Sequence, residues 1–109
     1  MSLEATETEC AVNAVAPRVS LASMEAKIAA RYDFTGGTAV GDAPVHDALK
    51  LLSICILVME NGFSIIGKSA PASAANFNAE LGRKLAYEDA IRQLWPLEGY
   101  ALRSQLFGA

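Results

Sequence analysis

The sequence predicts an α+β fold, in which an N-terminal helix, a central β-hairpin and a long C-terminal helical segment share one core. Asn61-Gly62 lies between two runs of aliphatic residues, a pattern that favours the tight turn of a hairpin. The last third of the chain repeats apolar residues at helical spacing. With 109 residues, 52% of them apolar and 19% charged, the chain is expected to fold as one domain.

The N-terminal part predicts a tail followed by a helix. Residues 1–16 show no sustained periodicity and little bulk, so we expect a flexible tail, with a partner-binding strand as the alternative. The single α+β domain would then occupy residues 17–109. Ser20 can cap a helix that runs to about Arg31. The apolar side of this helix would carry Leu21, Met24 and Ile28.

The hairpin is predicted to be apolar on both faces. A two-residue turn at Asn61-Gly62 would place Val58 opposite Ile65 and direct their face toward the core. The core face would carry Ile54, Ile56, Val58, Phe63 and Ile65. The opposite face would carry Cys55, Leu57, Met59 and Ile66. A strand with water on one side should alternate between apolar and polar residues, and this one does not.

Another chain or another part of this chain must therefore shield the second apolar face from water. The predicted helices can cover only one face, and an isolated two-stranded hairpin is marginally stable in water. We expect Leu57, Met59 and Ile66 to form an assembly surface in a homo-oligomer, by face-to-face packing or by pairing of strand edges. The competing interpretation is a third strand from residues 33–45, although residues 35–44 have the glycine and proline content of a loop.

A long helical segment is predicted over residues 73–107, with Ser73 or Asn76 as its cap. Pro96 lacks a backbone N–H, so the helix is expected to kink or stop near Trp95 and to continue as a shorter helix. Lys84 and Glu88 fall within the apolar side of the long helix. They are interpreted either as the edge of that side or as a charged pair that serves an interface.

The sequence offers little chemistry for catalysis. His46 is the only histidine, and a lone loop histidine lacks the nucleophile and the orienting group that a catalytic base needs. No cluster of histidine, cysteine or carboxylate residues has metal-ligand spacing, so no metal and no other cofactor is expected. Cys10 and Cys55 are expected to be reduced thiols. We therefore predict that the protein is not an enzyme and has no catalytic residues.

The charge pattern bears on the partners. Three glutamates within residues 1–16 account for the net charge of −3, because residues 16–109 carry nine acidic and nine basic side chains. Nucleic-acid binding through phosphate contacts would require a basic surface, so this class is not favoured. The longest apolar run, residues 51–59, is too short to cross a bilayer, and no signal peptide precedes it. We expect a cytoplasmic protein with no membrane contact.

Three segments are distinctive in combination: NGFSIIGKSA (61–70), NFNAELGRKLAYEDA (76–90) and LWPLEGYALRSQL (94–106). Together they resemble a family of small phage and prophage proteins described as gene-product-49-like. The resemblance spans about residues 16–106 and implies a bacteriophage or prophage gene expressed in the bacterial cytoplasm. It implies no particular biochemical activity. Within these segments we assign a structural role, as opposed to a binding role, to Asn61, Gly62, Phe63, Asn76, Phe77, Pro96 and Gly99.

The function that the sequence favours is a non-catalytic phage accessory protein, a homo-oligomeric binding module that acts on a host component. One alternative is a sponge that holds a small nucleotide-like signal between chains, using Arg83, Arg92 and Arg103 with aromatic side chains. A second alternative is a nucleic-acid-associated phage protein. The candidate interface or ligand residues are Leu57, Met59, Ile66, Lys84, Glu88, Arg92, Trp95, Tyr100 and Arg103.

Overall fold

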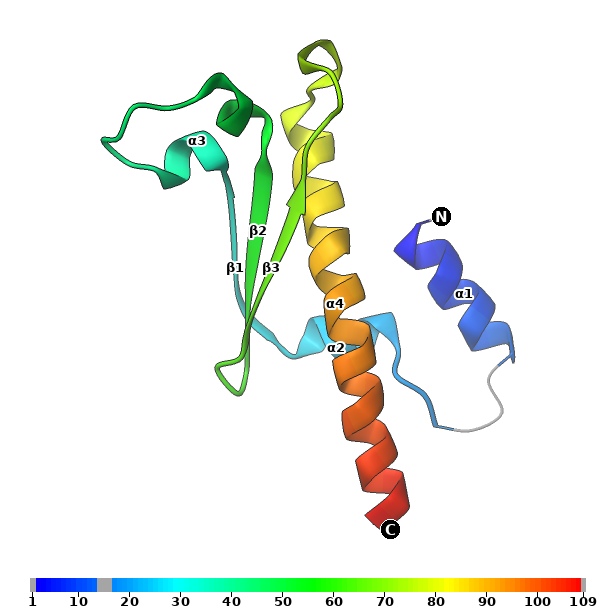
Figure 1. Cartoon of the computed structure of the whole chain (residues 1–109). Helices are drawn as coiled ribbons and strands as arrows, with labels where there is room; N and C mark the ends of the chain where they lie inside the picture. Colours follow the sequence, from blue (N-terminus) through cyan, green and yellow to red (C-terminus); the bar gives the residue numbers. More distant parts are fainter. Residues whose placement is uncertain (1, 14–16, 109) are drawn as a thin grey trace.

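The computed structural model describes residues 2–13 and 17–108 as a three-stranded antiparallel sheet with one long helix against one face (Figure 1). This arrangement confirms the predicted α+β class, with its N-terminal helix and its long C-terminal helix. The strand order is β1-β2-β3. The three strands are β1 (Ile28–Thr35), β2 (Ser53–Met59) and β3 (Ser64–Ser69). The helices and 3₁₀ turns are α1 (Leu3–Asn13), α2 (Leu21–Ala26), α3 (Gly36–Ala39), η1 (Asp47–Leu51), η2 (Ala74–Asn76) and α4 (Ala79–Gly108).

The segment predicted as a tail contains helix α1. Leu3 is buried in the common core, and the Glu7 carboxylate accepts a hydrogen bond from the Leu21 backbone N–H at 2.7 Å. Glu7 also pairs with the Arg18 guanidinium, which holds the pKa of this carboxyl below its ordinary value. These contacts attach α1 to the start of α2. Residues 1 and 14–16 of the predicted tail lie outside the described residues.

Helix α2 begins where the sequence predicts, but it ends early. The Ser23 N–H donates to Ser20 Oγ at 3.0 Å and the Ser20 N–H donates to Ser23 Oγ at 3.2 Å, which forms a capping box. The predicted extension to Arg31 is wrong, because the chain enters β1 at Ile28. The β-branched and aromatic residues of this segment pair with β2 as a strand, and such long-range pairing overrides a helical spacing.

The alternative to a homo-oligomer for covering the hairpin was a third strand, and β1 is such a third strand. It begins at Ile28, five residues before the predicted range of 33–45, and it overlaps that range only over residues 33–35. It adds to the edge of β2 without covering either face. Thr35 is its last residue, and the Thr35 hydroxyl accepts a hydrogen bond from Thr38 N–H at 3.3 Å to cap α3. The expected loop chemistry of residues 35–44 therefore begins only after the strand.

The hairpin turns at Asn61-Gly62, but through a loop one residue longer than predicted. The Gly62 N–H donates to the Met59 carbonyl at 2.9 Å, and the Met59 N–H donates to the Phe63 carbonyl at 2.8 Å. Gly62 has a φ of 85°, which glycine adopts readily and which a three-residue hairpin loop requires. The Asn61 side-chain oxygen also accepts from the Phe63 N–H at 3.0 Å.

The longer loop shifts the register by one residue and reverses the predicted faces of β2. Leu57 lies opposite Ile65, whereas the sequence-based register paired Val58 with it. Because side chains alternate along a strand, this shift exchanges the core side and the outer side of β2, whereas Ile65 and Ile66 of β3 lie on the sides that were predicted. The core therefore contains Cys55, Leu57 and Met59 of β2. The predicted core position is wrong for Ile54, Ile56, Val58 and Phe63. It is confirmed for Ile65, which is buried in the core.

Helix α4 begins at Ala79, three residues beyond Asn76, the later of the two predicted caps. Its N-terminal cap is Asn78, whose side-chain oxygen accepts from the Leu81 N–H at 3.0 Å. Ser73 instead precedes the short turn η2, and Asn76 is the last residue of that turn. Pro96 does not end the helix, which continues to Gly108, so the predicted stop and separate shorter helix are wrong. The Pro96 nitrogen has no hydrogen to donate to the Arg92 carbonyl, and one helical hydrogen bond is therefore absent there.

The sheet and α4 approach most closely at Gly67 of β3. A Cβ atom on Gly67 would lie 2.6 Å from the Ala90 backbone nitrogen and closer still to the Ala86 carbonyl oxygen. Ala86 and Ala90 are both fully buried, so small residues on both sides permit this contact.

The outer edge of β3 is also occupied by α4. The Lys68 backbone N–H donates to the Asp89 carboxylate at 2.9 Å, and Gln93 Nε2 donates to the Ile66 carbonyl at 2.8 Å. The helix thus satisfies backbone groups that an edge strand leaves unpaired.

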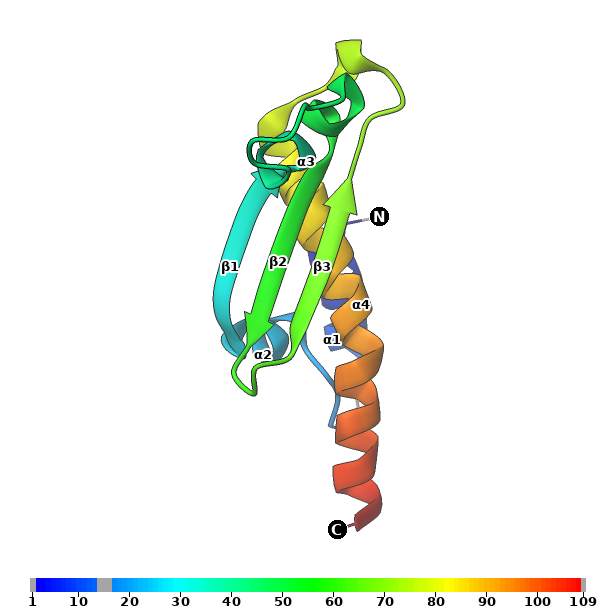
Figure 2. The ribbon, with the colours of Figure 1, turned by 60° about the vertical axis from the view of Figure 1, so that its left-hand side comes forward.

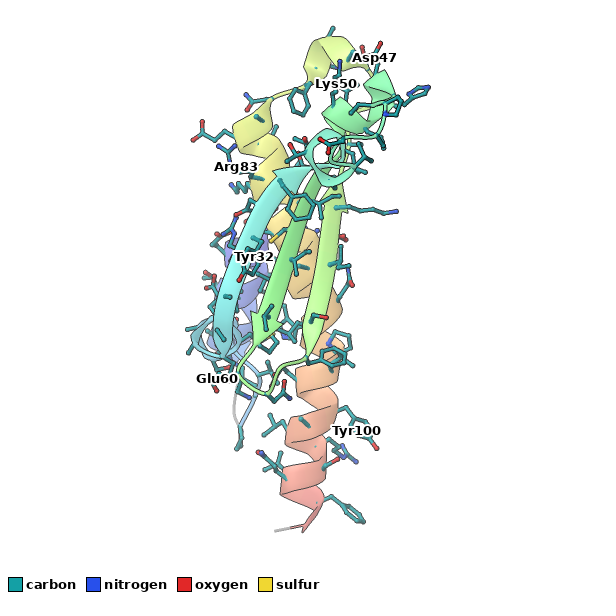
Figure 3. All side chains as sticks on the ribbon, turned by 90° about the vertical axis from the view of Figure 1, so that its left-hand side faces the viewer. Tyr32, Asp47, Lys50, Glu60, Arg83 and Tyr100 are labelled. Carbon is teal, nitrogen blue, oxygen red and sulfur yellow. The ribbon has the colours of Figure 1, made fainter. Side chains whose placement is uncertain are left out.

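The last turns of α4 extend beyond the sheet. Figure 3 shows Tyr100 on this part of the helix, past the hairpin loop that Glu60 marks. The molecule measures 54 × 28 × 17 Å, and its radius of gyration of 16.5 Å exceeds the roughly 13 Å of a compact chain of this length. This extension carries the exposed apolar residues Leu97, Tyr100, Leu106 and Phe107.

Candidate functional site

The face of the sheet opposite α4 has no helix packed over its strands, as Figure 2 shows from the side of the three strands. We call this surface the open face and define it by Tyr32, Phe34, Ile54, Ile56, Val58 and Ile66. Tyr32 and Ile66 are 57% and 58% exposed, and the other four side chains are half-buried. An apolar surface of this kind typically marks an interaction site.

The middle of the open face is a continuous apolar row. Tyr32 of β1 pairs with Ile56 of β2, and Ile56 pairs with Ile66 of β3, so that one row crosses all three strands. Polar side chains appear only at the β3 ends of the neighbouring rows, at Ser64 and Lys68. An apolar centre with a polar margin is the usual composition of a protein–protein interface.

The structure separates the three residues that the sequence assigned to an assembly surface. Leu57 is 0% exposed and Met59 is 5% exposed, and both contribute to the core beneath α4. Their assignment to an exposed interface is therefore corrected, and the register shift explains the error. Ile66 does lie on the open face. The residues that sequence reasoning placed in the core, Ile54, Ile56 and Val58, surround it there.

The predicted site residues of α4 do not form one site. Lys84, Arg92, Tyr100 and Arg103 are exposed, whereas Trp95 packs partly against the core. Glu88 is only 6% exposed, and among the described residues its Oε2 atom has no hydrogen-bond partner. Lys84 and Glu88 were interpreted as the edge of the apolar side or as a charged pair at an interface, and of the two only Lys84 is exposed on a single chain.

The three arginines proposed for a nucleotide-like ligand are not grouped within one chain. Arg83 and Arg92 are nine residues apart, which places them on opposite sides of a helix at about 100° per residue. Arg83 stands near the start of α4 (Figure 3), and Arg103 lies on the extension at the other end of the helix. None of them belongs to the open face, because α4 packs against the other side of the sheet.

A polar cluster lies where β1 faces α4. Arg31 bonds the Asp33 carboxylate through Nε at 2.9 Å, and its guanidinium carbon stands 4.2 Å from the centre of the Tyr87 ring. The Tyr87 hydroxyl donates to the Glu25 carboxylate at 2.5 Å. Burial, followed by this hydrogen bond, raises the pKa of Tyr87. The cluster fixes the side chains that point from β1 toward the helix.

Cys55 lies beside this cluster and is not an activated nucleophile. Burial, with Asp33 as the next cause, raises the pKa of the Cys55 thiol to about 11. A thiol with such a pKa is almost entirely protonated at neutral pH, whereas the thiolate is the reactive form. Cys55 is therefore a core residue.

We expect the two cysteines to differ sharply in reactivity. At pH 7.5, iodoacetamide should modify the exposed Cys10 readily, while Cys55 should react only after the protein is unfolded. Mass spectrometry of the intact protein and of its peptides measures both sites. Modification of Cys55 in native buffer at a rate similar to that of Cys10 would contradict the burial and the raised pKa.

A groove of about 450 Å³ lies between the hairpin loop and α4. Phe63 and Leu97 contribute apolar walls, and Lys27 bonds Glu98 at 2.8 Å along it. Phe63 is 54% exposed here, although the sequence placed it in the core. Sequence reasoning missed this groove because it depends on the continuation of α4 past Pro96.

His46 has a structural role. Its Nδ1 atom accepts a hydrogen bond from the Ala48 N–H at 3.0 Å and so caps η1, at the end of the sheet where Figure 3 marks Asp47.

Within residues 2–13 and 17–108, no group of three or more histidine, cysteine or acidic side chains is arranged to hold a metal ion. Across the same residues, the helices are too short or too polar to cross a membrane.

Comparison with known proteins agrees with the resemblance seen in the sequence motifs. The family described as phage protein (N4 Gp49/phage Sf6 gene 66) matches residues 19–106, which include the whole sheet and nearly all of α4. Neither a curated protein nor a solved structure shows significant similarity to the chain. The match covers most of the sequence, and the chain therefore belongs to the phage protein (N4 Gp49/phage Sf6 gene 66) family.

Proposed function

We propose that this phage protein is a non-catalytic, homo-oligomeric binding module that acts on a protein of the host bacterium in the cytoplasm. The main observation that supports this proposal is the apolar open face of the sheet. Its central row of Tyr32, Ile56 and Ile66 leaves a broad apolar surface in water, which a partner with its own apolar patch would cover.

A protein partner fits this surface better than a small ligand does. Small-molecule sites are concave and surround most of their ligand, whereas the open face is the outer surface of a sheet. The arginines that could bind a phosphate lie on α4, away from the open face. The sponge and the nucleic-acid alternatives therefore receive less support than protein binding.

The chemistry of the side chains supports a role without catalysis. His46 caps a turn, and the Cys55 thiol is buried with a raised pKa of about 11. In the described part of the chain, His46 Nδ1 accepts its hydrogen bond from a backbone N–H and not from a nucleophile that it could activate.

The open face can be tested with one substitution and a matched control. A host protein that copurifies with the tagged chain from infected cells should bind the purified chain in isothermal calorimetry. Ile66→Lys should weaken this binding by at least about tenfold, because a lysine would interrupt the apolar row. Leu106→Lys is the control, since Leu106 is 49% exposed on the α4 extension and Ile66 is 58% exposed.

Two results would contradict the proposal. Loss of binding with Leu106→Lys but not with Ile66→Lys would move the interface to the extension of α4. Failure of the purified host protein to bind the chain would show that the copurification was indirect.

A further inference from the structure

We infer that a second copy of the chain pairs with the outer edge of β1, antiparallel, with Tyr32 opposite Tyr32 of the partner subunit. This inference deepens the homo-oligomeric part of the proposed function, because it names the surface, the partner and the register. It concerns an edge of the sheet, whereas host binding uses a face. The two surfaces can therefore be tested separately.

The two edges of the sheet differ. Asp89 and Gln93 of α4 bond the backbone of β3 at Lys68 and Ile66, so that edge is already occupied. Figure 2 shows no element along the outer side of β1. A strand edge with unpaired N–H and C=O groups is a template for pairing with another strand.

The backbone groups available on β1 can be identified. The Gly36 N–H donates to the Leu52 carbonyl at 2.8 Å, and Tyr32 pairs with Ile56 in the same register. Antiparallel strands alternate between residues that bond one neighbour and residues that point away from it. Arg31 and Asp33 therefore direct their backbone groups outward, and nothing within residues 2–13 and 17–108 bonds these groups.

The charges of β1 select one register. If Tyr32 lies on the two-fold axis, Arg31 faces Asp33 of the partner subunit, and Asp33 faces Arg31 of the partner subunit. Opposite charges across an antiparallel pair are stabilising, and like charges are destabilising. A shift by one residue in each chain would place either two Arg31 or two Asp33 side chains opposite each other. The chosen register also lets both outward-facing residues exchange backbone hydrogen bonds.

The consequence for the open face follows from the symmetry. A two-fold axis through the strand pair stands perpendicular to the sheet, so α4 of both copies lies on the same side. The sheet becomes continuous across both copies, and the two open faces join into one apolar surface centred on the two Tyr32 side chains. The homo-oligomer would thus enlarge the surface proposed for the host protein.

Charge exchange tests the register. Arg31→Asp alone and Asp33→Arg alone should each weaken dimerisation by at least about tenfold in analytical ultracentrifugation, because like charges then face each other. Mixing the two variants should restore a heterodimer, in which every cross-strand pair is again opposite in charge. Each variant also lacks the ion pair between Arg31 and Asp33 within its own chain. If that pair only stabilised the fold of a single chain, mixing the two variants would not restore dimerisation.

Cysteine cross-linking locates the axis directly, and it uses a Cys10→Ser background. Tyr32→Cys should form a disulfide-linked dimer, because residues facing each other in a non-hydrogen-bonded pair have Cα atoms about 4.5 Å apart. Phe34→Cys is the matched control on the same face. In the inferred register it faces Ala30 of the partner subunit and lies on the order of 13 Å from its own counterpart.

The inference would be overturned by a wild-type chain that stays monomeric at all accessible concentrations. A dimer in which Phe34→Cys cross-links as efficiently as Tyr32→Cys would overturn it as well. The two proposals fail separately. Ile66→Lys should leave the dimer intact while it weakens host binding by at least about tenfold, so unchanged host binding with an intact dimer would contradict only the host-binding proposal.

Discussion

Replacing Gly67 by alanine is expected to prevent stable folding of the chain. The added methyl group would lie 2.6 Å from the Ala90 backbone nitrogen and closer still to the Ala86 carbonyl oxygen. Both are backbone atoms of α4, so no side-chain rotation can make room for it. The helix would have to move away from β3, which would open the core around Ile91 and cost about 3 kcal/mol or more.

The matched control for Gly67→Ala is Gly99→Ala. Gly99 lies within α4, and a Cβ atom there would meet no atom within 4 Å. Alanine favours a helix interior by about 1 kcal/mol relative to glycine, so this variant should be slightly more stable than the wild type. Urea unfolding followed by circular dichroism measures both changes. A wild-type unfolding midpoint for Gly67→Ala would show that α4 does not lie against β3 as described.

Leu57→Ala is expected to lower the free energy of unfolding by about 2–5 kcal/mol, because it leaves a cavity at a fully buried position. The comparison variant is Ile66→Ala, which removes a side chain that is 58% exposed on the open face. Its effect should stay within about 1 kcal/mol. The pair therefore reports which side of the hairpin faces the core.

The same unfolding experiment distinguishes the two hairpin registers. The register with a two-residue turn places Leu57 and Ile66 together on the outer face, so both substitutions would then have small effects. A small effect of Leu57→Ala combined with a native circular dichroism spectrum would contradict the three-residue loop. A large effect at both positions would indicate that the open face is covered in the assembled protein.

The features that were predictable from the sequence are those with a local cause. The hydroxyl of Ser20 satisfies an N–H group three residues ahead, and the Asn61-Gly62 pair supplies the positive φ of the hairpin loop. Helix α4 was recognisable because its apolar spacing extends over many turns. In each case the residues that form the feature are neighbours in the chain.

The features that were not predictable depend on distant residues. Ile28 continues the helical spacing of Leu21 and Met24, and only its pairing with Met59 makes it part of a strand. The hairpin register depends on whether the loop contains two or three residues, and both loops accept Asn61-Gly62. Pro96 was expected to kink or stop the helix, because a proline disrupts the local hydrogen bonds, and the helix continues to Gly108.

The sequence predicted that an apolar face of the hairpin would lack a covering helix, but it did not predict which residues form that face. Counting apolar side chains on both faces of the hairpin correctly indicated that one face would remain without a helix. The choice of face depended on the register, so Leu57 and Met59 were assigned to the surface and Ile56 to the core. A residue count can therefore indicate an uncovered surface before the structure shows which side chains form it.

The contacts of Asp89 and Gln93 with the outer strand limit how far this protein can grow by self-assembly. A sheet with two unprotected edges can add further chains at both ends without limit, which is the route to fibres. With the edge of β3 blocked, the β1 edge is the one sheet edge that the described residues leave open to strand addition, and the inferred pairing would use it. If two chains pair through β1 as inferred, growth by strand addition would stop at a closed pair and would not continue into a fibre.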